Sequence, residues 1–276
     1  MQNALTVDVE DYFHPTEVQQ RLTAPWESLP SRVEYATGRV LDLLAARGVR
    51  ATCFVLGWVA ERFPRLVRAI ADQKHEIGCH SYAHQLVFDM SPEEFRRDTM
   101  RATQAIGDAC GVRPTIYRAP SFSITQRSLW ALEILVEAGF KADASIYPIA
   151  HDRYGIPGFS RHATTVATAS GPILEIPTAT VQLSKTRVAP VGGGAYLRLL
   201  PYRYTAAGIR RLNQEEARPA CIYFHPWELD AEQPRLVSGG IARFRSYIGL
   251  RGMEAKLARL TREFQFSTLS AVFCSA

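Results

Sequence analysis

Short β-rich runs alternate with amphipathic helical segments along this chain of 276 residues, and no other feature limits the fold as strongly. Repeated strand–helix units predict a parallel sheet with helices packed outside it. We therefore expect an α/β fold. The expected strands span about 5–7, 51–57, 76–79, 115–117, 140–143 and 220–224, and the expected helices span about 32–47, 59–73, 126–138 and 204–217, with one more opened by the N-cap sequence Ser91-Pro-Glu-Glu94.

Residues from about 149 to 201 break this alternation. They are rich in glycine, proline, threonine and serine, and they hold only short strand-like pieces at 173–176 and 180–183. A long amphipathic helix at about 241–262 and a strand near 266–269 follow later in the chain. Since no internal repeat or linker is found, we predict one domain over residues 1–276. It carries an irregular insertion at about 149–201 and a C-terminal helix and strand at about 240–270.

The composition argues against several functional classes. The hydrophobic content of 47% and the charged content of 21% are ordinary for a soluble globular protein. The net charge of +5 comes from scattered arginines, and no nucleic-acid-binding motif accompanies it. No apolar run is long enough for a membrane span, and no signal peptide precedes the first strand. The five cysteines lack metal-finger spacing and favour reduced thiols. These features predict a cytoplasmic protein with neither a nucleic-acid partner nor stable membrane insertion.

Polar side chains suited to catalysis lie where the predicted strands end. In a parallel α/β barrel the carboxyl ends of the strands build the active site, so residues at these positions meet in one place. A random distribution would not put every candidate there. The candidates are Asp8, Glu10 and Asp11 after the first strand, His80 and His84 after the third, Arg118 after the fourth, Asp143 at the fifth and His225 after the strand at 220–224.

His80 and His84 are the first candidates for a metal site. Histidines four residues apart lie on one face of a helical turn and can present ring nitrogens to one metal ion, although structural histidines are also common. Asp8 and Glu10 share one face of an extended segment, and with Asp11 beside them they repel one another unless a cation neutralises them. A solvated acidic turn is the alternative. Together the two groups favour a site of two histidines and one carboxylate, which leaves positions open for water and substrate.

Arg118 and His225 are supporting candidates. Arg118 directly follows a strand and is followed by Ala-Pro, so rigid backbone can hold its guanidinium against a charged partner. A surface arginine is the alternative. His225 follows an apolar strand and an aromatic residue, and a capped core histidine is the alternative there.

These segments together resemble the polysaccharide deacetylases of carbohydrate esterase family four, the nodulation-factor deacetylase homology group. The resemblance covers roughly residues 4–145 and 219–229, and its most specific part is the histidine motif. Three segments also resemble, more narrowly, the subgroup encoded with exosortase-type exopolysaccharide loci. The family motifs match Leu5–Asp8, Ala51–Gly57, His75–His84, Arg118–Pro120, Asp143 and Tyr223–His225 in order, and those of the subgroup match Asp8–His14, Gly192–Pro201 and His225–Glu228.

The resemblance implies a distorted (β/α)7-type barrel in which one carboxylate and two histidines hold a divalent metal, usually Zn²⁺. Asp8 would be the general base toward a metal-activated water, and His225 would protonate the departing sugar amine. The backbone N–H of Ser121 would stabilise the oxyanion. Arg118 would orient Asp8, and Asp143 would steady Arg118 or His225. The implied reaction removes N-acetyl groups from an amino-sugar exopolysaccharide or its precursor, so the implied partner is an N-acetylated oligo- or polysaccharide.

The first motif departs from the family pattern at Val9, which separates two acidic positions that are adjacent in most members. Either Glu10 or Asp11 could then supply the metal ligand, and the face shared by Asp8 and Glu10 favours Glu10. Relatives with altered first motifs include ring-opening amidohydrolases. The alternative function is therefore an allantoinase-like or cyclic-imide hydrolase on the same barrel. A non-catalytic carbohydrate-binding relative is a third hypothesis, and the retained catalytic set argues against it.

Overall fold

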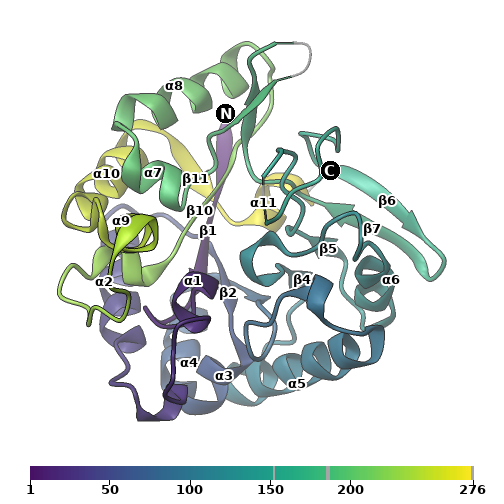
Figure 1. The fold of residues 1–276 in the computed structure, drawn as a ribbon. Helices are drawn as coiled ribbons and strands as arrows, with labels where there is room; N and C mark the ends of the chain where they lie inside the picture. The colour runs from purple at the N-terminus through teal and green to yellow at the C-terminus, as the bar shows by residue number, and fades with distance from the viewer. Residues whose placement is uncertain (152, 185–186, 275–276) are drawn as a thin grey trace.

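A parallel sheet forms the centre of the computed structural model, which describes residues 1–151, 153–184 and 187–274 (Figure 1). The strands of this sheet are β1 (Gln2–Val9), β2 (Thr52–Val55), β3 (Glu76–Cys79), β4 (Ile116–Tyr117), β5 (Ala142–Asp143), β6 (Thr164–Thr168), β7 (Gly171–Glu175), β10 (Cys221–Phe224) and β11 (Gln265–Ser267). Seven of them run parallel in the order β10-β1-β2-β3-β4-β5-β7. β6 adds an antiparallel edge to β7, and β11 pairs with the start of β1. The predicted α/β fold with a parallel sheet is confirmed.

The central strands of this sheet bury both faces, as parallel sheets covered on both sides do. Residues 3–9 of β1 are all buried, and its alternate side chains point into two different cores. Leu5 and Val7 belong to the large core that the helices share. The side chains on the other face come together from many elements, as in the interior of a barrel. This inner cluster includes Ala4, Phe54, Ile116, Ala142, Ile176, Cys221 and Leu269.

Backbone contacts also link the two ends of the row of parallel strands. The N–H of Ala179, a few residues after β7, donates to the carbonyl of Cys221 in β10 at 3.0 Å. Gly193 forms a parallel bridge to Tyr223 of the same strand. Gly193 has a φ of 119°, and a Cβ there would lie 1.9 Å from the Tyr223 carbonyl oxygen, so only glycine allows this approach. The glycine run at 192–194 thus lets the irregular segment lie directly against β10.

Helices surround the sheet, and most of them lie on its outside (Figure 1). They are α1 (Thr16–Gln19), α2 (Val33–Ala45), α3 (Gly57–Arg62), α4 (Pro64–Asp72), α5 (Pro92–Cys110), α6 (Trp130–Glu137), α7 (Ala195–Leu199), α8 (Tyr202–Gln214), α9 (Gly240–Tyr247), α10 (Leu250–Glu263) and α11 (Leu269–Phe273). The predicted start of α5 is confirmed, because Ser91 and Glu94 form a reciprocal capping box. No helix among the described residues is both long enough and apolar enough to cross a membrane.

Two predicted helices are each divided in two. The single helix expected over 59–73 is wrong, since Phe63 leaves the helical region with φ −126° and ψ 55° and α4 begins at Pro64. The residue before a proline is sterically disfavoured in the helical conformation. The single helix expected over 241–262 is wrong as well. It breaks between α9 and α10, where Ile248 is extended and Gly249 is left-handed at φ 85°.

The irregular segment at 149–201 is more ordered than its composition indicates. It supplies β6 and β7, and β7 pairs in parallel with β5 inside the main sheet. A separate two-stranded sheet follows, made of β8 (Thr180–Gln182) and β9 (Val188–Pro190). Residues 152, 185 and 186 of the predicted insertion, and the last two residues of the predicted domain, lie outside the described residues. The segment therefore contributes to the central sheet as well as to its periphery.

Candidate active site and metal centre

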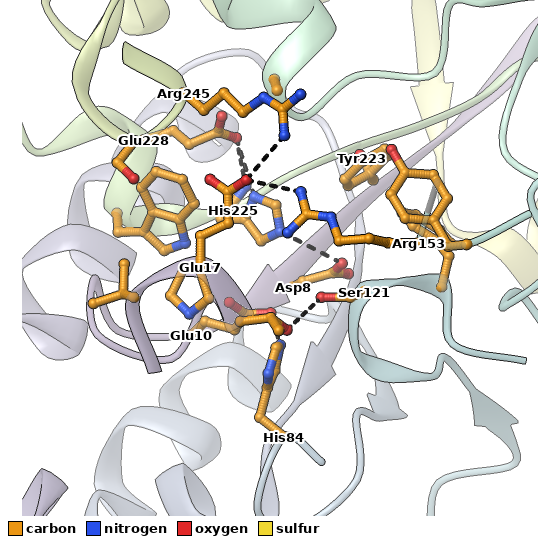
Figure 2. Close-up of a pocket in the computed structure, with 18 of the residues that line it drawn as sticks. Asp8, Glu10, Glu17, His84, Ser121, Arg153, Tyr223, His225, Glu228 and Arg245 are labelled. Atoms are coloured by element: carbon orange, nitrogen blue, oxygen red, sulfur yellow. Dashed lines mark hydrogen bonds and ion pairs between the residues drawn. The ribbon is translucent and has the colours of Figure 1, made fainter. Parts of the chain in front are cut away.

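Most of the residues predicted at the strand ends meet around one cavity of about 340 Å³ (Figure 2). They arrive from the ends of β1, β3, β4 and β10, because parallel strands present their carboxyl ends on one side of a sheet. His80 and Arg118 are fully buried and contact the lining residues. The candidates that line the cavity are Asp8, Glu10, His84, Ser121 and His225.

The geometry of Glu10, His80 and His84 fits a metal site. Glu10 Oε1 lies 2.9 Å from His80 Nε2 and 3.1 Å from His84 Nε2. Ligands at about 2.0–2.2 Å from a tetrahedral Zn²⁺ lie roughly 3.3 Å apart, close to these separations. His80 Nδ1 lies 2.8 Å from the Arg118 carbonyl oxygen, which can only accept, so Nδ1 carries the hydrogen and Nε2 is free to bind a metal. The three side chains therefore form a candidate facial site.

The charge state of Glu10 also suits a cation site. Burial disfavours its carboxylate, but the neighbouring His84 and His225 outweigh burial and hold the pKa of Glu10 well below its usual value. The second carboxylate oxygen of Glu10, Oε2, is buried and has no hydrogen-bond partner among the described residues. A buried anionic oxygen without a partner is costly, and a bound cation or its water would satisfy it.

The helical turn expected between the two histidines is wrong. Residues 80–84 form an irregular loop in which Ser81 and His84 adopt left-handed backbone, with φ of 66° and 51°. Asp98 on α5 anchors this loop by accepting the N–H of Tyr82 at 2.9 Å. The two imidazoles converge because a tertiary contact shapes the loop, and helical periodicity plays no part.

Asp11 does not take part in the candidate metal cluster among the described residues. Its Oδ2 accepts the Ser31 hydroxyl at 2.5 Å and the Arg32 N–H at 2.9 Å, and Val33 donates to it at 3.2 Å. The residue at the N-cap position of α2, Arg32, has no capping side chain, so Asp11 satisfies the first amides of that helix from a distance. Of the two alternatives for the carboxylate ligand, the geometry favours Glu10.

Asp8 and Arg118 form a buried ion pair beside the metal cluster. Arg118 Nη1 donates to Asp8 Oδ1 and to the Thr6 hydroxyl, both at 2.7 Å, and its Nε donates to the Ala144 carbonyl at 3.2 Å. The guanidinium also lies 4.3 Å from the centre of the Phe54 ring. Arg118 thus holds Asp8 Oδ1, and the other carboxylate oxygen, Oδ2, lies on the side of His225, whose Nε2 is 3.9 Å away.

His225 is held by a second buried ion pair that the sequence reasoning missed. Its Nδ1 lies 3.2 Å from Glu228 Oε2, and Glu228 Oε1 accepts Arg198 Nε at 2.9 Å. Glu228 and Arg198 are both buried, at 0% and 2% exposure. Burial disfavours the imidazolium, but Glu10 and then Glu228 outweigh burial and raise the pKa of His225 to about 9. Only the acidic residue three positions after His225 could have indicated this arrangement from the sequence.

Asp143 makes contacts other than the predicted ones to Arg118 or His225. Its Oδ1 accepts the Ser145 hydroxyl at 2.5 Å, and the Ser145 Oγ in turn accepts the Ala119 N–H at 2.7 Å. Its register partner on β7 is Glu175, also fully buried. Asp143 is therefore linked to Arg118 indirectly, through Ser145 and the Ala119 backbone. These hydrogen bonds join the loop after β4 to the loop after β5.

The carboxyl pair of Asp143 and Glu175 provides a prediction for stability against pH. Burial, and then the charge of Asp143, raise the pKa of Glu175 well above its usual value. The folded chain thus keeps a proton that the unfolded chain releases above about pH 4.5, so stability falls as pH rises through this range, by up to about 1.4 kcal/mol per pH unit. Glu175→Gln is expected to flatten this slope in urea unfolding between pH 5 and 8. The exposed Glu215→Gln is the control, and equal slopes in both variants would contradict the shared proton.

The loop after β4 holds Ser121 at the cavity wall. Ser121 and Phe122 both have left-handed backbone, with φ of 51° and 53°, which costs a residue other than glycine about 1 kcal/mol or more. Ser121 Oγ lies 2.9 Å from Thr16 Oγ1 on α1. This strained loop therefore places the Ser121 backbone beside the candidate catalytic residues.

Two segments of the chain match known protein families. Residues 26–142 match the family model described as polysaccharide deacetylase, and residues 144–274 match a domain of unknown function, DUF3473. The chain is 35% identical over 98 residues to the peptidoglycan-N-acetylglucosamine deacetylase of Bacillus cereus, a match that covers 35% of this chain and 36% of that protein. The chain thus spans only about a third of the length of this curated relative.

Two solved structures share the fold across nearly the whole chain. A putative polysaccharide deacetylase from Mycobacterium smegmatis superposes with a TM-score of 0.63 at 19% identity, covering 98% of this chain and 89% of that one. Puue allantoinase superposes with a TM-score of 0.66 at 16% identity, covering 98% and 87%. At such identities the likeness concerns the fold alone. The family match therefore leads to one conclusion: residues 26–142 form a polysaccharide deacetylase domain, and DUF3473 follows it at residues 144–274.

Proposed function

We propose that this protein is a metal-dependent hydrolase that removes N-acetyl groups from an amino-sugar polysaccharide or its precursor. One observation carries the proposal. Glu10, His80 and His84 form a candidate metal site in the same cavity as a carboxylate, Asp8, and an imidazole, His225, that can act as base and acid. Amide hydrolysis needs these parts together: an activated water, a proton acceptor and a proton donor to nitrogen.

The residues of the cavity divide this chemistry between them. The metal, most simply Zn²⁺, would supply a Lewis acid that acidifies water and polarises the acetyl carbonyl. Asp8, fixed by Arg118, accepts the proton of the attacking water as the water oxygen bonds to the acetyl carbon. The developing negative oxygen is stabilised in part by the Ser121 N–H. His225 then donates the proton on Nε2 to the amine nitrogen as the C–N bond breaks, which releases acetate and a free amino sugar.

The buried pair of Arg198 and Glu228 supports the role of His225. Glu228 accepts the hydrogen of Nδ1, so the remaining ring nitrogen, Nε2, faces Asp8 and the cavity. The same carboxylate stabilises the imidazolium that an acid catalyst needs at the start of its step. Glu228 thereby takes the part that the family resemblance had led us to assign to Asp143.

An exopolysaccharide or its precursor is the substrate class that we propose within this function. The proposal rests on the resemblance of Asp8–His14, Gly192–Pro201 and His225–Glu228 to proteins of exopolysaccharide loci. The Bacillus cereus relative, by its name, acts on N-acetylglucosamine in peptidoglycan, which has the same acetamide group. Hydrolysis of a ureide or cyclic imide is the second candidate, because the fold is shared with Puue allantoinase.

Acetate release from N-acetylglucosamine oligomers tests this proposal directly. The purified chain is assayed as isolated, after chelation and after Zn²⁺ is added back, with allantoin hydrolysis measured in parallel. We expect acetate release that chelation abolishes and Zn²⁺ restores. Turnover of allantoin without acetate release would favour the second candidate. Acetate release that is insensitive to chelation would contradict the metal-dependent mechanism.

A further inference from the structure

Two arginines lie at the mouth of the cavity, outside the groups that the proposed mechanism uses. Arg153 comes from the segment after β5, and Arg245 lies on α9 (Figure 2). Both contact one side chain, Glu17 on α1: Arg153 Nη2 lies 2.8 Å and Arg245 Nη1 3.2 Å from the same oxygen, Oε1. All three residues line the cavity. Three distant parts of the chain therefore bring two guanidinium groups to one point.

The exposure of these groups indicates that they serve more than the stability of the fold. The Arg153 and Arg245 side chains are 39% and 44% exposed, and Glu17 is 20% exposed. Ion pairs this open to solvent contribute little to stability. The buried pairs Arg118–Asp8 and Arg198–Glu228 differ from them, because each is enclosed and holds a catalytic side chain. Among the described residues, the two guanidinium groups share the single carboxylate of Glu17.

We propose that Arg153 and Arg245 form a subsite for an acidic group of the substrate, a carboxylate or a phosphate, next to the N-acetylated sugar that is hydrolysed. In the free protein the Glu17 carboxylate lies in this subsite, so the two guanidinium groups already bind a carboxylate there. Arginine pairs with carboxylate and phosphate oxygens through charge-assisted hydrogen bonds. An acidic group of the substrate replaces Glu17 there, and little stability is lost because the displaced pair is exposed.

This inference rests on the proposed deacetylase function and specifies its substrate further, as an acidic glycan or a sugar phosphate. The subsite lies at the cavity mouth, and neither arginine contacts Asp8, Glu10 or His225 in the interactions described above. It should therefore act on substrate binding and on KM, with little effect on kcat. Because the attraction is electrostatic and exposed, the preference should also weaken as salt concentration rises.

Three ligands and one double variant test the subsite. Chitotetraose is the neutral ligand, a tetrasaccharide alternating N-acetylglucosamine and glucuronate carries carboxylates, and UDP-N-acetylglucosamine carries phosphates. Binding is measured by calorimetry and acetate release by kinetics, for wild type and for Arg153→Gln combined with Arg245→Gln. Arg243→Gln is the matched control, since Arg243 is an exposed arginine on α9 that does not line the cavity.

We expect the wild type to bind at least one acidic ligand about tenfold more tightly than chitotetraose. The double variant should lose this preference, while its affinity for chitotetraose and the behaviour of Arg243→Gln stay unchanged. Glu17→Gln should tighten binding of the acidic ligand, because a competing carboxylate is removed. The glucuronate ligand and the nucleotide sugar identify carboxylate and phosphate, respectively, as the group recognised.

Equal binding of neutral and acidic ligands by the wild type would overturn the subsite, as would an unchanged preference in the double variant. The calorimetric result decides this question even where no acetate is released. Selective binding of an acidic ligand without acetate release from any ligand would support the subsite and contradict the proposed deacetylase function. Acetate release from chitotetraose without any preference for the acidic ligands would support the deacetylase function and contradict the subsite.

Discussion

Replacing His84 with alanine is expected to lower kcat/KM for acetate release by at least about 1,000-fold, because metal activation contributes several kcal/mol and each 1.4 kcal/mol is about tenfold in rate. His84 is one of two imidazoles facing Glu10 Oε1, so its removal leaves two of the three protein ligands. Metal content after dialysis should fall in parallel with activity. Both are measured on the same preparation, by elemental analysis and by an acetate assay.

His162→Ala is the matched control for this substitution. His162 is a partly exposed histidine on the segment before β6, where it pairs with Glu216 at 3.4 Å, and it does not line the catalytic cavity. It should keep wild-type metal content and activity. A His84→Ala protein that retains stoichiometric metal and full activity would show that the metal site is misassigned. Thermal unfolding of both variants separates loss of metal from loss of fold.

Replacing Asp8 with asparagine is expected to lower kcat by about 10²–10⁴-fold, the usual contribution of a general base. Asparagine keeps the shape of the side chain and can still accept a hydrogen bond from Arg118, but it cannot take a proton from water. The candidate metal ligands Glu10, His80 and His84 are unchanged, so the variant should still bind metal. Acetate release under substrate saturation, normalised to metal content, measures the effect.

Asp8→Asn also leaves the Arg118 guanidinium buried without its anionic partner, which destabilises the fold. Activity is therefore measured well below the unfolding midpoint of the variant. Asp108→Asn on the exposed face of α5 provides the same chemical change away from the cavity, and it should leave metal content and kcat unchanged. If Asp8→Asn bound metal and kept the kcat of wild type, another group would be the base.

The central strands were predictable because local pattern and burial agree in them. β1, β2 and β3 are short apolar runs bounded by polar or glycine residues, and their side chains are buried on both faces. β6 was not predicted, since none of its residues is buried and its one strand partner among the described residues is β7. The break between α3 and α4 was visible in principle at Pro64, whereas hydrophobic periodicity continued across it. Edge strands and helix breaks depend on neighbours that periodicity does not describe.

The candidate site was predictable to the extent that it depends on strand ends. Asp8 lies in the last residues of a buried parallel strand, and His80, Arg118 and His225 directly follow such strands, so topology alone brings them to one side of the sheet. The supporting contacts could not be predicted in this way. Arg198 and Glu228 are 30 positions apart, and their pairing requires the glycine-rich segment at 192–194 to lie against β10.

The sequence by itself indicated the α/β fold, the end of the sheet where the polar residues gather and the two histidines of the candidate metal site, because the strand pattern combined with parallel topology brings the strand ends together. The tertiary structure alone decided how the carboxylates are used. Asp8, Glu10 and Asp11 are nearly adjacent and chemically alike, yet one pairs with Arg118, one faces the histidines and one caps α2. Each role is set by partners that lie from about 20 to 110 positions away, and only folding brings them within hydrogen-bonding distance.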